Sequence, residues 1–139
     1  MNTENKFFIR DKITLHTEIV IDSAHRLVNY QGECSRIHGH TWKVDVWIQG
    51  KIEDKDVIGI LFDFGKIKII KEKLDHRFLN DIEPFDKINP TAENLSLYIL
   101  EELLEINPIL EYRVKIFETA IGKETWCQMQ TTEFDIKYL

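Results

Sequence analysis

Apolar and polar residues alternate along four stretches of the chain, and a period of two residues predicts β-strands. The first stretch ends at His25, and its apolar residues are separated by two positions or by a multiple of two. The second covers residues 42–48 and the third residues 113–118. A fourth strand is expected near residues 126–129. The tail at 134–138 alternates in the same way, which favours an additional edge strand.

Two stretches between the second and third strands repeat instead at helical spacing, with apolar residues three or four positions apart. The first begins after Asp63, a residue type that caps helix N-termini, and ends near Asp75. The second begins after Pro90, with Thr91 as the expected N-cap, and ends before Pro108. The apolar stripes are Phe64, Ile67, Ile70 and Leu74 in the first helix, and Leu95, Ile99, Leu103 and Ile106 in the second.

The resulting order ββααββ predicts one α+β domain over residues 1–139. In this arrangement two helices cover one face of an antiparallel four-stranded sheet. The outer strands of such a sheet leave backbone hydrogen-bonding groups unpaired. We therefore expect the protein to form homo-oligomers through its sheet edges.

Charge and composition narrow the class of partner. The net charge of −6 argues against a nucleic-acid surface, whereas a metal and a few basic side chains would still attract a small anionic substrate. No apolar run reaches transmembrane length, and residues 1–6 lack the features of a signal peptide. Two cysteines make no disulfide framework. We expect a cytoplasmic protein that does not associate with membranes.

Candidate metal chemistry concentrates in the segment Cys34–His40 and at His25. His38 and His40 are two positions apart, so their side chains point to the same face of an extended strand. If the strand that ends at His25 pairs with theirs, three imidazoles converge. Three histidines without an obligatory fourth ligand are typical of a catalytic zinc site, although iron, copper and nickel also bind imidazole. Cys34 supplies either a fourth ligand or a reactive thiol beside the metal.

Two further positions carry candidate chemistry. The carboxylate of Asp75 can orient the imidazole of His76, and beside Cys34 this pair would complete an acid–base set. Taken alone, the pair is more simply an exposed helix end. Glu118 ends a strand, and the residues alone favour a carboxylate in water. The functional alternative for Glu118 is a carboxylate that accepts two hydrogen bonds from an amidine-like ligand edge.

Several motifs together point to a known family. They are Ser23–Leu27, Cys34–His40, Asp63–Phe64, Leu74–His76 with Leu79–Asn80, Pro90–Asn94 and Phe117–Thr119. In content and order they make the chain resemble the 6-pyruvoyl-tetrahydropterin synthase and 6-carboxytetrahydropterin synthase family over roughly residues 14–130. The resemblance implies a tunnelling fold, in which the sheets of several subunits join edge to edge into an oligomeric barrel. The usual assembly is a homohexamer of two trimers, with active sites at subunit interfaces.

The resemblance also implies a role for each candidate residue. Glu118 would anchor the pterin ring through its amino and ring N–H groups, which replaces the solvent interpretation. The implied site residues are the Zn²⁺ ligands His25, His38 and His40, the general base Cys34 with its proton-relay partners Asp75 and His76, and the pterin contacts Glu118 and Thr91.

The implied substrate is 7,8-dihydroneopterin triphosphate. We expect conversion to 6-carboxy-5,6,7,8-tetrahydropterin, with release of acetaldehyde and triphosphate, toward queuosine and other deazapurines. The preference rests on a Lys-, Ile- and Asn-rich composition that looks bacterial, since bacterial members mostly belong to this branch. The alternatives are a 6-pyruvoyl-tetrahydropterin synthase, which stops after triphosphate loss, and a non-catalytic domain in which Cys34 closes a structural zinc site. An aldolase-like relative is a weaker alternative, because that variant commonly has a glutamate at the position of Cys34.

Overall fold

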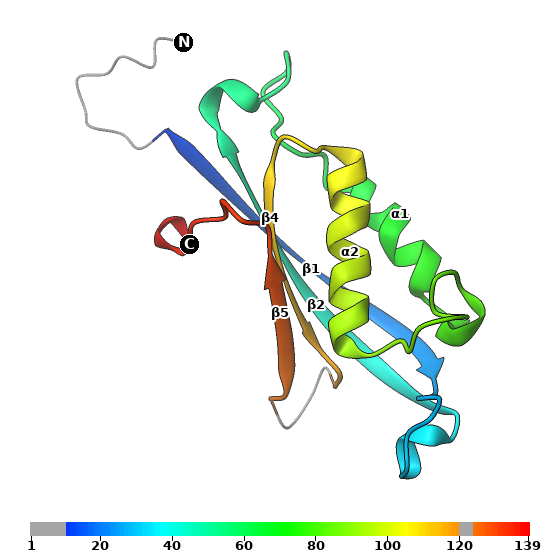
Figure 1. Ribbon diagram of the computed structural model, residues 1–139. Helices are drawn as coiled ribbons and strands as arrows, with labels where there is room; N and C mark the ends of the chain where they lie inside the picture. The colour runs from blue at the N-terminus through cyan, green and yellow to red at the C-terminus, as the bar shows by residue number, and fades with distance from the viewer. Residues whose placement is uncertain (1–10, 120–123) are drawn as a thin grey trace.

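The computed structural model describes residues 11–119 and 124–139. Residues 1–6, where we expected no signal peptide, lie outside them. The described elements follow the predicted order with one added strand (Figure 1). They are β1 (Lys12–His25), β2 (His38–Lys51), α1 (Gly65–Leu74), β3 (Arg77–Phe78), α2 (Ala92–Ile106), β4 (Glu111–Phe117) and β5 (Trp126–Gln130), with short 3-10 helices at Glu33–Ser35, Ile52–Asp54, Leu79–Asp81 and Ile136–Tyr138.

The strands form an open five-stranded sheet in the order β3-β1-β2-β4-β5. The four predicted strands are confirmed, and they pair antiparallel with their neighbours. The prediction of only four strands is wrong, because β3 pairs parallel with the end of β1. β3 has two residues, which are too few to show an alternating pattern. Assembly of such open sheets into a barrel stays a prediction.

Both helices lie side by side on one face of the sheet, as the sequence predicted (Figure 1). The central strand β2 places Val44, Val46 and Ile48 against them with no exposed surface. The helices bury the predicted residues Ile67, Ile70, Leu74, Leu95, Ile99 and Leu103. Of the two remaining predicted residues, Ile106 is partly buried against the core, whereas Phe64 precedes α1 and is 45% exposed. None of the helices in the described part of the chain is long and apolar enough to cross a membrane.

The two predicted helix starts differ in accuracy. Thr91 caps α2 as expected, because its side-chain oxygen accepts a hydrogen bond from the Asn94 N–H at 3.1 Å. Asp63 stands one position further from α1 than an N-cap, since that helix begins at Gly65. Its Oδ1 nevertheless accepts a hydrogen bond from the Gly65 N–H at 2.8 Å. Both capping residues therefore contribute to the helix starts.

The C-terminal tail is not the edge strand that its alternation favoured. It ends in the 3-10 helix Ile136–Tyr138. Its backbone forms hydrogen bonds with the side chain of buried Gln49 instead of pairing with a strand. Gln49 Nε2 donates to the Asp135 carbonyl at 2.7 Å, and Gln49 Oε1 accepts from the Asp135 N–H at 2.8 Å. The Gln49 side chain on β2 thus makes the two backbone hydrogen bonds with Asp135 that a neighbouring strand would otherwise make.

Two asparagines from the connection between the helices hold the chain just beyond β1. The side-chain amide of Asn80 exchanges two hydrogen bonds with the backbone of Arg26, at 2.9 and 3.0 Å. Asn89 does the same with the backbone of Val28, at 2.8 and 3.0 Å. These pairs fix the segment that follows His25 against the loop that leads to α2.

Candidate metal centre and the surrounding pockets

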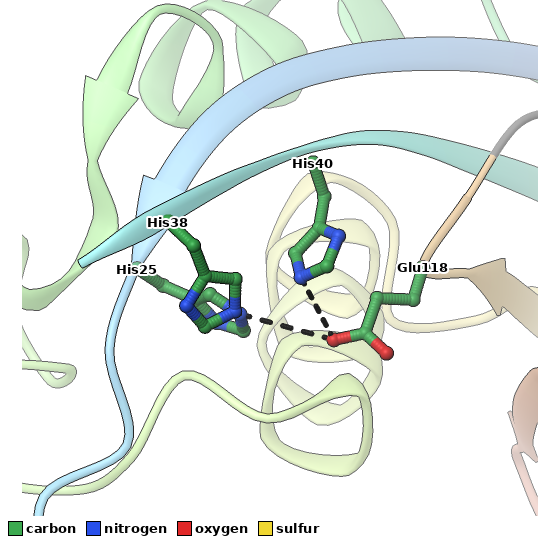
Figure 2. A group of neighbouring side chains, drawn as sticks. All are labelled: His25, His38, His40 and Glu118. Carbon is green, nitrogen blue, oxygen red and sulfur yellow. Dashed lines mark hydrogen bonds and ion pairs between the residues drawn. The ribbon is translucent and has the colours of Figure 1, made fainter. Parts of the chain in front are cut away.

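The β1–β2 hairpin brings the three predicted histidines together. Its register places His25 directly opposite His38 and Ser23 opposite His40. The ring centroids are 4.6 Å apart for His25 and His38, 5.0 Å for His25 and His40, and 4.8 Å for His38 and His40. Figure 2 shows the three rings turned toward one common point. The expected convergence of imidazoles is confirmed.

Backbone carbonyl groups determine which ring nitrogens are free. His25 Nδ1 lies 2.7 Å from the Pro90 oxygen, and His38 Nδ1 lies 2.7 Å from the Arg36 oxygen. A carbonyl only accepts hydrogen bonds, so each Nδ1 must carry its hydrogen and donate it. In the neutral rings the Nε2 atoms then present lone pairs. Metal-binding histidines usually donate their other ring N–H to a backbone carbonyl or carboxylate in this way.

The donor set fits a zinc ion. The Nε2 atoms of His25 and His38 are 3.0 Å apart, which would oppose two lone pairs unless a cation or proton lies between them. Zinc–nitrogen bonds of about 2.0–2.1 Å in a tetrahedral shell would separate neighbouring ligand atoms by about 3.3 Å. His40 Nε2 is buried and makes no hydrogen bond within the described residues. A metal ion would satisfy this atom and the two facing lone pairs together.

Burial favours the neutral form of two of the three imidazoles. The pKa of His25, which is 2% exposed, is lowered mainly by burial, against the opposing effect of its hydrogen bond to Pro90. Burial likewise lowers the pKa of His40, although the nearby Glu118 carboxylate opposes the shift. The indole of Trp42 packs edge-on against both rings, with centroid distances of 5.2 and 5.1 Å. Neutral imidazoles near pH 7 are the form that binds metals.

Glu118 follows β4 and points toward the histidines rather than only into water. Its Oε1 lies 3.1 Å from His40 Nε2 and 3.8 Å from His25 Nε2, although the side chain is 43% exposed (Figure 2). The interpretation drawn from the residues alone, a carboxylate at a strand end in water, is therefore wrong. Of the described residues, His25, His38, His40 and Glu118 form one group whose ligand atoms all lie within 4.8 Å of one another.

Cys34 lies beside this group but outside it. It is half-buried in the 3-10 helix Glu33–Ser35 and lines a cavity of about 260 Å³ together with His25, Glu118 and Thr91. The described residues that could share one metal ion do not include Cys34. Of the two alternatives for this cysteine, the reactive thiol beside the metal fits the structure and the fourth ligand does not. Cys127 packs against the core and lines the same cavity.

Asp75 and His76 lie elsewhere. His76 lines a more open cavity of about 460 Å³, which also includes His40 but not Cys34. His76 Nε2 is 3.6 Å from Asp75 Oδ2, and its side chain is 78% exposed. A single chain therefore does not assemble the expected Cys–Asp–His set. Completion of that set at a subunit interface stays a prediction.

The structure adds two residues that the sequence did not single out. The Asp22 N–H donates to Asp75 Oδ1 at 2.8 Å, and the Asp22 carbonyl accepts from the His76 N–H at 2.7 Å. Thr41 Oγ1 in turn donates to Asp22 Oδ1 at 2.6 Å. These contacts help to hold His76 in a left-handed conformation, φ 54°, which is uncommon outside glycine. In the sequence, Asp22 is an ordinary aspartate on the polar face of a strand, so residue type alone did not indicate that it holds Asp75 and His76.

Comparisons with known proteins agree with these observations. The sequence profile of the 6-pyruvoyl tetrahydropterin synthase family matches residues 14–131, a segment that includes every candidate site residue. The 6-carboxy-5,6,7,8-tetrahydropterin synthase of Rickettsia bellii is 31% identical over 126 residues, covering 73% of this chain and 90% of that protein. The 6-pyruvoyl tetrahydrobiopterin synthase of Dictyostelium discoideum is 35% identical over 116 residues, covering 72% and 84%. The structure of Caenorhabditis elegans 6-pyruvoyl tetrahydropterin synthase superposes with a TM-score of 0.69 at 25% identity, covering 91% of this chain and 100% of that chain.

Proposed function

Because this chain belongs to the 6-pyruvoyl tetrahydropterin synthase family, we propose that it is a zinc-dependent lyase acting on 7,8-dihydroneopterin triphosphate. The proposed products are 6-carboxy-5,6,7,8-tetrahydropterin, acetaldehyde and triphosphate. One observation carries this proposal: three imidazoles converge with a carboxylate in one group of possible metal ligands, and two of its members, His25 and Glu118, line a cavity that also holds the Cys34 thiol. The relative from Rickettsia bellii is named for this carboxy product.

His25, His38 and His40 would hold the zinc ion. The carbonyl groups of Pro90 and Arg36 fix two of the rings so that Nε2 faces the metal position. Zinc bound there would act as a Lewis acid on hydroxyl oxygens of the substrate side chain and so acidify the neighbouring protons.

Cys34 is the proposed base for those protons. It shares a cavity with His25, so a substrate in that cavity would lie between the metal position and the thiol. A thiolate removes a proton effectively when a positive charge nearby favours its ionised form. A dication held by the histidines would supply that charge.

Asp75 and His76 are the proposed relay partners of Cys34, contributed by an adjacent copy of the chain. The exposure of His76 supports this assignment, because its side chain lies open at the surface while its backbone is fixed by Asp22. Among the described residues, the open sheet also leaves one edge of β5 and most of one edge of β1 without a partner strand. We propose a homohexamer of two trimers, in which joined sheets bring the two half-sites together.

Glu118 and Thr91 are the proposed contacts of the pterin ring. Both line the cavity that contains Cys34. A carboxylate accepts two parallel hydrogen bonds from neighbouring N–H donors, which matches the amino and ring N–H groups of a pterin. We place the reaction in the cytoplasm, which agrees with the two free cysteines of the described chain. We also place it in queuosine-type biosynthesis, to which the proposed carboxy product leads.

A 6-pyruvoyl product is the second candidate. It is favoured by the 35% identity to the Dictyostelium discoideum protein, which is named for that product. Incubation of the zinc-loaded protein with 7,8-dihydroneopterin triphosphate, followed by mass spectrometry, separates the two. The proposal predicts 6-carboxytetrahydropterin and acetaldehyde. A pyruvoyl product without acetaldehyde would assign the second candidate, and unchanged substrate would refute both.

A further inference from the structure

The position of Glu118 indicates a role in addition to binding the substrate. Its Oε1 lies among the imidazole nitrogens, 3.1 Å from His40 Nε2 and 3.8 Å from His25 Nε2. With the 3.0 Å separation of the His25 and His38 nitrogens, these distances lie on both sides of the spacing of about 3.3 Å that a tetrahedral zinc shell sets. The four side chains are therefore arranged as one coordination group.

We propose that Glu118 is the fourth metal ligand while no substrate is bound, and that it leaves the metal when substrate enters. This inference rests on the proposed function, since it requires the histidines to hold zinc. It gives Glu118 two alternating contacts, the metal in the free protein and the pterin ring in the complex. Zinc–carboxylate bonds of about 2.0–2.2 Å are common in proteins.

The relative orientation of His40 and Glu118 supports a shared ion. Their 3.1 Å contact is short enough for an ion pair, yet His40 Nε2 makes no properly directed hydrogen bond. Two groups joined by a hydrogen bond point at each other, whereas two ligands of one ion both point at the ion. The close but misaligned contact has the second geometry.

The four ligands differ in how firmly the protein holds them. The rings of His25 and His38 are fixed by carbonyl groups at 2.7 Å. The Glu118 carboxylate is 43% exposed, and its polar contacts within the described residues are those with His25 and His40. Glu118 also lines the cavity of about 260 Å³. It can therefore rotate from the metal toward that cavity without losing a backbone contact that the described residues show.

The test compares metal binding and ligand exchange in Glu118→Gln and Glu118→Ala with the wild-type chain. Zn²⁺ affinity is measured by competition with a chelator, and free imidazole is titrated into the Co²⁺-loaded protein by visible absorption. Imidazole is neutral, so its binding does not simply report the loss of a negative charge. Glu93→Gln is the matched control, because Glu93 lines the same cavity but lies outside the metal group.

We expect Glu118→Gln and Glu118→Ala to weaken Zn²⁺ binding at least about 10- to 100-fold, which is the loss seen even for residues that only support a ligand. In both variants imidazole should bind the Co²⁺ centre at least about tenfold more tightly, because it no longer competes with the carboxylate. Glu93→Gln should change neither quantity more than about twofold. Thermal melting of each metal-free variant separates the loss of one ligand from damage to the fold, because only damage would lower the melting temperature of the metal-free protein.

Wild-type values in both Glu118 variants would overturn the inference and leave the histidine site intact. Equal effects in Glu93→Gln would also overturn it, because they would show a general charge effect. Failure of the wild-type chain to bind zinc would instead refute the proposed function itself.

Discussion

Replacement of Cys34 by alanine separates a catalytic thiol from a metal ligand. The thiol shares a cavity with His25 and Glu118 but stands outside the group of described residues that could bind one ion. We therefore expect Cys34→Ala to retain zinc. Loss of a positioned general base lowers turnover by about 10²–10⁴-fold, which corresponds to about 2.7–5.4 kcal/mol in the activation free energy.

The assay measures kcat together with the zinc content of each variant. Cys127→Ala is the matched control, because it removes the other thiol that lines the same cavity. We expect Cys127→Ala to keep kcat within about threefold, since that side chain packs against the core. Because Cys34 is only half-buried, removal of its sulfur should change the free energy of unfolding by less than about 1 kcal/mol.

Loss of zinc in Cys34→Ala would refute the reasoning, because it would make Cys34 a ligand. Undiminished kcat with zinc still bound would also refute it, since the thiol would then not be the base. An equal fall in Cys127→Ala would mean that cavity shape, rather than proton transfer, limits the rate.

Three further predictions concern the fold and its stability. Chelation of zinc should abolish turnover but preserve the far-ultraviolet circular dichroism spectrum, because the core between sheet and helices does not need the metal; unfolding on chelation would favour the structural zinc site. Gln49→Leu should lower the free energy of unfolding in urea by about 1–3 kcal/mol, since it removes both side-chain hydrogen bonds to the Asp135 backbone and leaves the Asp135 N–H without a partner among the described residues, whereas Gln130→Leu at an exposed position of β5 should be nearly neutral. Burial raises the pKa of Tyr112, which donates to the Asn107 carbonyl. The neutral phenol therefore contributes stability that is complete below pH 10 and is lost as pH rises. At pH 11 the free energy of unfolding of the wild type should have fallen by about 1.4 kcal/mol more than that of Tyr112→Phe. Parallel curves of stability against pH for the two proteins would contradict this.

The sequence predicted the framework of the fold because its main elements are long and periodic. The alternation in 42–48 and the helical stripe of Leu95, Ile99 and Leu103 correspond to β2 and α2. The convergence of His25 with His38 and His40 followed once those strands were paired, since spacing along a strand fixes the face. The two-residue strand β3 and the 3-10 helix at Ile136–Tyr138 depend on contacts distant in sequence, so local pattern could not reveal them.

The candidate site was predictable in its residues but not in its grouping. Motif order identified Cys34, Asp75 and His76, yet only the fold shows that Cys34 lines a different cavity from His76. The direction of Glu118 also depends on the end of β4 lying beside the β1–β2 hairpin. Asp22 fixes Asp75 and His76 mainly through its backbone N–H and carbonyl groups. Every residue type other than proline carries these groups, so the sequence could not indicate this contact.

The most direct test of the proposed zinc enzyme is a titration of the metal-free protein with Zn²⁺ while consumption of 7,8-dihydroneopterin triphosphate is followed. We predict that the rate rises in proportion to added zinc and levels off at one equivalent per chain. His38→Ala should show no such rise, because it removes a ligand that the Arg36 carbonyl holds in place. Full turnover by the metal-free protein, or an unchanged titration in His38→Ala, would contradict the assignment of this site as the zinc centre of a tetrahydropterin synthase.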